Sequence, residues 1–350
     1  MKMNSRKNYL DILKIFACFC VLADHSNYFV STGGARINPG MAQYPIAFIY
    51  LTIAHVAVTL FVMISGALLL GKEETYKKCF VRVIKTGLVI VIFTFIHYLL
   101  DKGFNNFNVK EYCSHVIKGD YIINYWYLYM YLGLLVMLPI LRKMVQVLKE
   151  RDFLFILFLT VICSFDFITG LNPWFNLPIF IPFLGVFILG YYLDNYDIKE
   201  LIPRFLAKEK VLFIVSSIGL VIDILSVALY SARESKMDNT VSNRLFCWDN
   251  IFFMYMAIYL FYWAKKLWLV KTDSSMRSIG LLKVLREGTY GIYLVHGTFM
   301  MVTAPYIAAF LDNSPMPQMV NWVILDIGLF VVCLGVTMVV KLVPGMKRLI

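Results

Sequence analysis

The chain has 350 residues, of which 60% are hydrophobic and only 16% are charged, and its mean hydropathy is +0.72. Soluble globular proteins are roughly 45–50% apolar and about 25% charged, so this composition excludes an ordinary soluble enzyme, a disordered chain and a disulfide scaffold. The formal net charge of +11 would suggest nucleic-acid binding in a soluble protein. In a membrane protein it first indicates basic residues gathered in cytoplasmic loops.

Ten stretches are long and apolar enough to cross a bilayer, which takes about 20 mainly apolar residues per helix. In chain order they cover residues 9–30, 44–70, 84–100, 122–141, 153–170, 176–193, 211–231, 248–264, 288–311 and 320–343. We therefore predict an all-α fold, a polytopic helical membrane bundle of about ten transmembrane helices. Residues 1–350 are predicted to form a single membrane domain.

The basic residues between these stretches predict how the chain is oriented. If the N-terminus is cytoplasmic, the inside segments carry 25 Lys and Arg residues, the outside segments carry 7, and Lys14 lies within a span. This asymmetry follows the positive-inside rule. It favours ten spans with both termini cytoplasmic, because a missed or additional span would disrupt the alternation.

The first predicted span carries three ionisable residues on one face, Asp11, Lys14 and His25. At about 100° per residue, Lys14 and His25 differ by roughly 20° around the helix axis and lie roughly 16 Å apart along it. Asp11 precedes Lys14 by three residues and can pair with it. Charged groups at this depth usually face the bundle interior or a water-filled cavity. The alternative interpretation is that Lys14 extends to the cytoplasmic surface and His25 only hydrogen-bonds within the bundle.

Two of the other histidines have both a structural and a functional interpretation, and a third has only a structural one. His55 lies near the middle of the second predicted span and His296 near the middle of the ninth, and a neutral imidazole at either place can bridge two helices or face a site. His115 lies in the predicted outside segment 101–121 and is expected to be a solvated surface residue. Asp326, deep in the last predicted span, is expected to bind a partner across helices or to line a path.

Two other residues are candidates for the site because of where they lie relative to the predicted spans. Arg82 lies in the basic segment YKKCFVRVIK before the third span, where it either determines topology or binds an anionic cofactor. Trp126 begins the fourth predicted span, where an aromatic belt at the interface is the structural interpretation. The sequence contains no motif that predicts a metal site.

Several of these segments together resemble the acyltransferase-3 family of integral membrane acyltransferases. YLDILKIFACFCVLADHS is similar to the family's opening helix, in which a basic residue precedes a histidine by ten intervening residues, here Lys14 and His25. The family usually has arginine at the first of these positions, and lysine keeps the charge but lacks the bidentate fork. HVAVTLFVMISGALLL resembles the second helix, with Ser65 and Gly66 as its Ser-Gly pair.

The later segments match in the same order. NYWYLYMYLGLLVMLPILRK resembles the family's tryptophan-bearing span, and LREGTYGIYLVHGTF resembles its late helix with Gly-Ile-Tyr and His. The matches run from about residue 6 to residue 300. The chain is most similar to small members of the family, of the enterobacterial common antigen O-acetyltransferase type.

The resemblance implies an O-acyltransferase of a bacterial cytoplasmic (inner) membrane. Such an enzyme moves an acyl group, usually acetyl, from cytoplasmic acyl-CoA to a hydroxyl of a cell-surface or lipid-linked glycan. His25 is then expected to take the proton of the acceptor hydroxyl, because a neutral imidazole titrates near working pH. The alternative is that His25 carries the acyl group transiently. Asp11 and Lys14 are its expected catalytic partners.

The resemblance also assigns residues to the two substrates. Lys14, Arg82 and Ser65 are expected to bind the donor acetyl-CoA, and Trp126, Tyr293 and His296 are expected to line the acceptor site. No metal and no nucleic-acid partner is implied. The alternative function is a transporter or flippase of a glycan or small polar solute, because charges within a helical bundle suit that role equally well.

Overall fold

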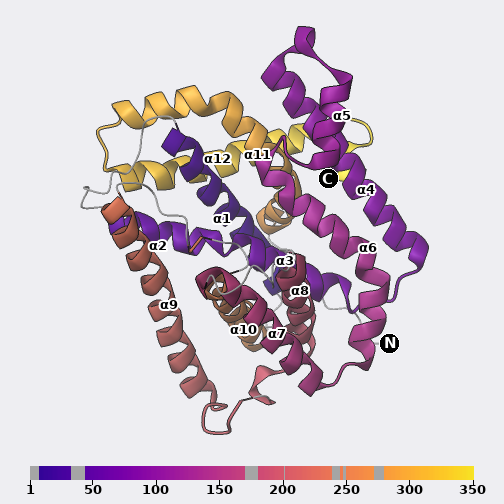
Figure 1. Cartoon of the computed structure of the whole chain (residues 1–350), viewed down its shortest axis with the longest axis vertical. Helices are drawn as coiled ribbons and strands as arrows, with labels where there is room; N and C mark the ends of the chain where they lie inside the picture. The colour runs from indigo at the N-terminus through magenta and orange to yellow at the C-terminus, as the bar shows by residue number, and fades with distance from the viewer. Residues whose placement is uncertain are drawn as a thin grey trace. The chain divides into compact units, whose positions relative to one another are not determined.

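The computed structural model describes residues 8–32, 44–169, 180–200, 202–238, 245–246, 250–271 and 280–350, and these ranges contain helices and no β-strand (Figure 1). The all-α prediction is therefore confirmed for the described part of the chain. The α-helices are α1 (Asn8–Thr32), α2 (Tyr44–His55), α3 (Ala57–Leu69), α4 (Tyr76–Lys102), α5 (Val109–Lys118), α6 (Trp126–Val147), α7 (Glu150–Thr169), α8 (Phe180–Asn195), α9 (Glu209–Asp238), α10 (Ile251–Lys271), α11 (Gly280–Asn313), α12 (Gln318–Val340) and α13 (Met346–Leu349).

A helix occupies each of the ten stretches predicted to cross the membrane. Among the described residues, six helices are both long and apolar enough to do so: Pro45–Leu69, Tyr76–Lys102, Trp126–Val147, Glu209–Met237, Gly280–Phe310 and Gln318–Val340. A shorter apolar helix, Ile181–Asn195, coincides with the predicted span at residues 176–193. The chain thus has the apolar helices of a membrane protein, while the total of ten spans and the cytoplasmic location of both termini stay predictions.

The chain forms two compact units that alternate along the sequence. The first unit comprises residues 1–24, 37–71 and 144–286, and the second comprises residues 25–36, 72–143 and 287–350. The single membrane domain over residues 1–350 stays a prediction.

Glycines set the helix packing in the first unit, where α3, α8 and α7 lie side by side (Figure 1). A β-carbon built at Gly66 would lie 1.8 Å from the backbone oxygen of Phe187, and one at Gly190 would lie 1.9 Å from the backbone oxygen of Met63. Both distances are far below van der Waals contact, so α3 and α8 can approach this closely only where a side chain is absent. Gly66, predicted as half of a Ser-Gly pair, therefore has a packing role.

In the second unit, glycines also lie where α11 contacts α12. A β-carbon at Gly288 would lie 2.3 Å from a methyl carbon of Leu334, and one at Gly291 would lie 2.1 Å from the methyl carbon of Thr337. These glycines bring the histidine-bearing part of α11 against α12. The absence of a side chain at Gly288 and Gly291 therefore leaves room for the side chains of Leu334 and Thr337 of α12 to pack against the backbone of α11.

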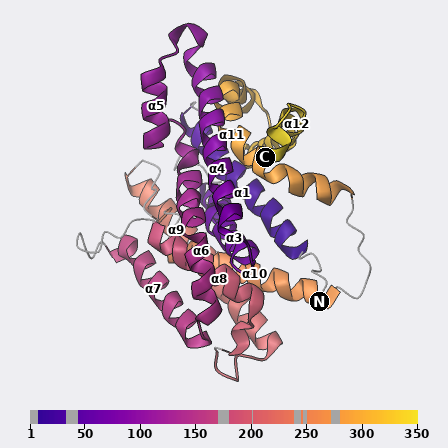
Figure 2. The same ribbon diagram turned by 90° about the vertical axis from the view of Figure 1, so that its right-hand side faces the viewer.

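A short helix, α5, folds back beside α4 in the second unit (Figure 2). It begins at Asn108, whose side chain accepts hydrogen bonds from the backbone N–H groups of Lys110 at 3.0 Å and Glu111 at 3.2 Å. Such a cap satisfies N–H groups that have no partner within the helix. It ends at Gly119, whose φ of 69° is the left-handed conformation that glycine adopts without a steric cost. The predicted outside segment 101–121 thus contains ordered structure.

Candidate active site

Two predicted site residues, His25 on α1 and His296 on α11, contact each other directly. Nδ1 of His25 lies 2.8 Å from Nε2 of His296, and the rings are stacked with their centroids 5.0 Å apart and their planes 12° apart. His296 is fully buried, and His25 is half-buried. The sequence analysis predicted both residues for the site but missed their contact, because helical periodicity relates residues of one helix and not of two distant helices.

One contact within α11 and one to the segment before α6 hold His296 in place. Its Nδ1 lies 2.5 Å from the backbone oxygen of Tyr293, and its Nε2 lies 3.3 Å from Nδ2 of Asn124. The Tyr293 hydroxyl donates to the backbone oxygen of Asn124 at 2.6 Å, and the Tyr125 hydroxyl donates to the backbone oxygen of Leu294 at 2.7 Å. These reciprocal bonds fix one turn of α11 against the start of α6.

The predicted acceptor residues differ in where they lie. Tyr293 and His296 belong to the hydrogen-bonded cluster around His25, whereas Trp126 is half-buried at the start of α6. Asn124 is buried and contacts His296, and the sequence analysis missed it. The available signal was a polar residue two positions before Trp126, at the beginning of an apolar stretch.

A second buried contact involves the residue after His25. The Ser26 hydroxyl donates to Oδ1 of Asp326 at 2.6 Å, and Asp326 is fully inaccessible to solvent. The expectation that Asp326 binds a partner across helices is therefore confirmed, and the partner is on α1. The second unit thus has polar side chains of α1, α11 and α12 buried among apolar residues, where such groups persist only when they are hydrogen-bonded.

His55 has the structural role that the sequence analysis allowed for it. In the first unit its Nδ1 lies 2.9 Å from Oδ1 of Asp24, and its ring packs against Phe253 and Phe246 with centroid distances of 4.7 and 5.3 Å. His55 is buried at the end of α2, next to the break before α3. An imidazole therefore bridges α1 and α2 here.

The remaining predicted residues of the first unit are Asp11, Lys14 and Ser65. Oδ2 of Asp11 lies 3.6 Å from Nη1 of Arg286, a partner that the sequence analysis missed. Lys14 on α1 and Ser65 on α3 are both half-buried. The pairing of Asp11 with Lys14, and the catalytic and donor-binding roles assigned to these residues, stay predictions.

Arg82 belongs to a cluster of charges in the second unit that one carboxylate holds together. Oε1 of Glu74 lies 2.8 Å from Nη2 of Arg82, and Oε2 lies 3.0 Å from Nη2 of Arg142. Arg142 is buried and also donates to Sγ of Cys79 at 3.3 Å, whereas Arg82 is partly exposed. The sequence analysis missed Glu74 and Arg142, because a basic residue at the end of a span is also the ordinary mark of membrane topology.

The electrostatics of this cluster follow from its geometry. Partial burial alone would raise the pKa of the Glu74 carboxyl, but the hydrogen bonds and positive charges of Arg82 and Arg142 outweigh burial and lower the pKa to about 2. Burial and then the charge of Arg82 lower the pKa of Lys72 in the same loop. Arg82 from α4, Arg142 from α6 and Lys72 from the loop between α3 and α4 therefore place an excess of positive charge near the ionised carboxylate of Glu74.

Replacing Glu74 with alanine is expected to destabilise the protein by about 1–3 kcal/mol, because two charge-assisted hydrogen bonds are lost and the buried guanidinium of Arg142 loses its counter-charge. Thermal unfolding of the purified protein in detergent measures the effect. The folded-state pKa of about 2 lies below the ordinary value of 4.5, so the stabilisation is complete above about pH 4.5 and disappears as the pH falls towards 2.

The matched control for this prediction is Glu73→Ala. Glu73 is exposed and adjacent to Glu74, so its replacement removes the same charge from the same loop and leaves the Glu74–Arg142 ion pair in place. We expect little change in the melting temperature of that variant. Equal destabilisation by the two substitutions would contradict the bridging role of Glu74.

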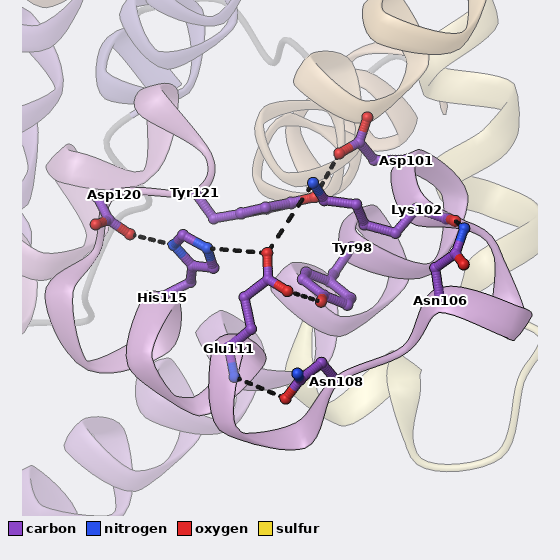
Figure 3. A network of polar contacts seen from close by, with 9 residues as sticks. All are labelled: Tyr98, Asp101, Lys102, Asn106, Asn108, Glu111, His115, Asp120 and Tyr121. Carbon is purple, nitrogen blue, oxygen red and sulfur yellow. Dashed lines mark hydrogen bonds and ion pairs between the residues drawn. The ribbon is translucent and has the colours of Figure 1, made fainter.

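Another polar network joins α5 to the end of α4 (Figure 3). The Tyr121 hydroxyl donates to Oδ2 of Asp101 at 2.5 Å, and Nδ1 of His115 lies 2.6 Å from Oδ1 of Asp120. Nε2 of His115 also lies 3.8 Å from Oε1 of Glu111. The hydrogen bond and charge of His115 lower the pKa of Asp120. His115, expected to be a solvated surface residue, is partly exposed. It also contacts the carboxylates of Glu111 and Asp120 at the end of α5.

No group of three or more His, Cys, Asp or Glu side chains within the described ranges is arranged to hold a metal ion. A family model described as an acyltransferase domain matches residues 7–342 of the chain. No curated protein and no solved structure matches it. The matched range includes every residue of the candidate site.

Proposed function

The chain belongs to the acyltransferase-3 family, and on that premise we propose that it transfers an acyl group, acetyl in the first instance, from acyl-CoA to a hydroxyl of a cell-surface or lipid-linked glycan. Its family and its long apolar helices make it a membrane acyltransferase. The observation that supports the finer proposal best is the direct contact of half-buried His25 with fully buried His296. An oriented, half-buried imidazole is the kind of group that takes a proton from a hydroxyl near neutral pH.

The proposed reaction uses His25 as a general base. His25 accepts the proton of the acceptor hydroxyl while the hydroxyl oxygen bonds to the thioester carbonyl carbon. The carbon–sulfur bond then breaks, and the departing thiolate of CoA receives the proton from His25. The products are the acylated glycan and free CoA, and no redox partner or metal enters the balance.

The cationic side chains around Glu74 are the proposed binding site for the phosphates of the donor. Arg82 and Arg142 are arranged about one anion, and Lys72 and Lys143 are neighbours in sequence of Glu74 and Arg142. Guanidinium groups suit phosphate oxygens because they present paired N–H donors. Lys14 and Ser65 are proposed to bind further along the donor, and Asp11 to neutralise part of that positive charge.

The proposed orientation places the loop between α3 and α4, and with it the proposed binding site of the donor phosphates, on the cytoplasmic side of a bacterial inner membrane. The 25 to 7 distribution of basic residues favours this orientation. The acceptor then approaches from the other side, and the proposed acceptor residues are Trp126, Tyr293 and His296. His25 lies eleven residues beyond Lys14 on α1, which is roughly 16 Å along a helix axis. A separation of this size suits a long, thin donor whose phosphates remain near the cytoplasm.

The proposed function is tested with the full-length protein in lipid vesicles. Vesicles receive acetyl-CoA labelled in the acetyl group, together with a bacterial lipid-linked glycan extract, and both free CoA and labelled glycan are measured. We expect release of CoA and incorporation of label in equal amounts. Movement of glycan across the bilayer without acetyl-CoA, and without label incorporation, would instead support the transporter and contradict the enzyme.

A further inference from the structure

The hydrogen bonds around His296 determine which of its nitrogens carries a hydrogen. A backbone carbonyl oxygen can only accept, so the 2.5 Å contact between Nδ1 of His296 and the oxygen of Tyr293 requires a hydrogen on Nδ1. In a neutral imidazole the other nitrogen then has the lone pair. The Nδ2 amide group of Asn124, a donor, lies 3.3 Å from that second nitrogen, Nε2, which agrees with Nε2 being an acceptor.

The tautomer of His296 also determines the tautomer of His25. Nε2 of His296 accepts, so Nδ1 of His25, 2.8 Å away, must be the donor and must carry the hydrogen. The lone pair of a neutral His25 is then on Nε2. The opposite arrangement would turn the lone pair of His296 Nδ1 towards the lone pairs of the Tyr293 oxygen. A doubly protonated His296 would place a full charge on a ring with no solvent exposure, which is costly without a counter-ion.

The surroundings keep this arrangement rigid. The two rings are stacked 12° from parallel, and the Tyr293 hydroxyl donates to the backbone oxygen of Asn124 at 2.6 Å. The carbonyl that fixes His296 and the amide that points at it therefore belong to one bonded frame. A base whose tautomer and ring angle are fixed before the substrate arrives needs less rearrangement during reaction.

We propose that His296 is a positioning residue, which holds His25 in the tautomer with a hydrogen on Nδ1 and so makes Nε2 the atom that takes the acceptor proton. This inference rests on the proposed function of His25. His296 plays the part that a carboxylate plays in serine hydrolase triads, where it orients the histidine through Nδ1–H, but it does so as a neutral group. When Nε2 gains its proton, the Nδ1–H bond to His296 becomes charge-assisted and stronger.

The test compares three replacements of His296 in the full-length protein. Glutamine places an amide oxygen near the position of Nε2 and can accept from His25, whereas asparagine is one methylene shorter and does not reach, and leucine has no acceptor. We expect kcat to fall by about 10²–10³-fold for His296→Leu and His296→Asn, and His296→Gln to recover kcat to within about tenfold of the wild type. The KM for acetyl-CoA is expected to stay unchanged in all three.

His97 provides the matched control. It is also a buried histidine of the second unit, and its Nδ1 lies 2.8 Å from the hydroxyl oxygen of Thr298. A purely structural role for such a ring predicts no preference of kcat for glutamine over asparagine, and we expect none at His97. The Gln–Asn comparison stays informative if His296→Leu fails to fold, because both of these variants keep a polar amide in the cavity.

The outcomes separate this inference from the proposed function. If His25→Ala is inactive while His296→Gln is as impaired as His296→Asn, His296 does not act through an acceptor at Nε2 and the inference is overturned. If His25→Ala retains turnover, the proposed function itself falls. Recovery of kcat by glutamine alone, with unchanged KM, supports the positioning role.

Discussion

Replacing His25 with alanine is expected to lower kcat for acetyl transfer by about 10³-fold or more, because the acceptor hydroxyl then has no group to take its proton. Expression, membrane insertion and the KM for acetyl-CoA are expected to remain near those of the wild type, since His25 is only half-buried and the proposed donor cations lie elsewhere in the chain. Initial rates of CoA release and glycan labelling, measured in vesicles over a range of acetyl-CoA concentrations, give kcat and KM.

The control for this substitution is His115→Ala. That residue is another partly exposed histidine of the second unit, and it contacts Asp120 and Glu111 instead of the histidine pair. We expect its replacement to leave kcat within about twofold of the wild type, in line with the small effects of most surface changes. Near-normal turnover by well-folded His25→Ala protein would show that His25 is not the general base.

Replacing Gly66 with alanine is expected to prevent normal packing of α3 against α8. The new β-carbon would lie 1.8 Å from the backbone oxygen of Phe187, and a backbone atom cannot rotate away as a side chain can. Overpacking of a core costs about 1–3 kcal/mol or more, and here two helices must separate along their contact. We expect a strong loss of monodisperse protein on size-exclusion chromatography and a lower melting temperature.

Gly87→Ala is the matched control, because Gly87 is also a helical glycine, on α4, and apart from the adjoining backbone of its own helix nothing lies within 4 Å of the β-carbon that would be added there. Alanine is the better helix former by about 1 kcal/mol, so this variant is expected to be as stable as the wild type or slightly more stable. A Gly66→Ala protein that melts like Gly87→Ala would show that α3 and α8 do not pack as described.

Much of the fold could be predicted from the sequence because each apolar stretch is long and is bounded by basic loops. The predicted stretch at residues 84–100 corresponds to α4, Tyr76–Lys102, and that at 320–343 corresponds to α12, Gln318–Val340. Hydropathy does not detect close helix packing, which depends on one absent side chain at Gly66 or Gly190. Composition also does not indicate that the chain alternates between two compact units.

The site was predicted as single residues but not as contacts. An ionisable residue within an apolar helix is unusual in itself, and His25, His296 and Asp326 could each be identified from the sequence for this reason. Their partners were harder to find because they are ordinary in local context: Asn124 precedes a span and Ser26 merely follows His25. Buried hydrogen bonds pair residues far apart in the chain, and no helical period relates them.

Glu74 already forms ion pairs with both guanidinium groups that the proposed donor phosphates would use, and its single negative charge offsets one of their two positive charges. Under the proposed function, an incoming phosphate exchanges with a carboxylate instead of meeting two bare cations. The net electrostatic gain of binding is then smaller than two arginines alone would provide. The same exchange runs in reverse once the acyl group has left, because the carboxylate is tethered nearby and competes for the arginines. Under the proposed function, we therefore expect this competition to speed the release of CoA, so that turnover is not limited by a product held too tightly.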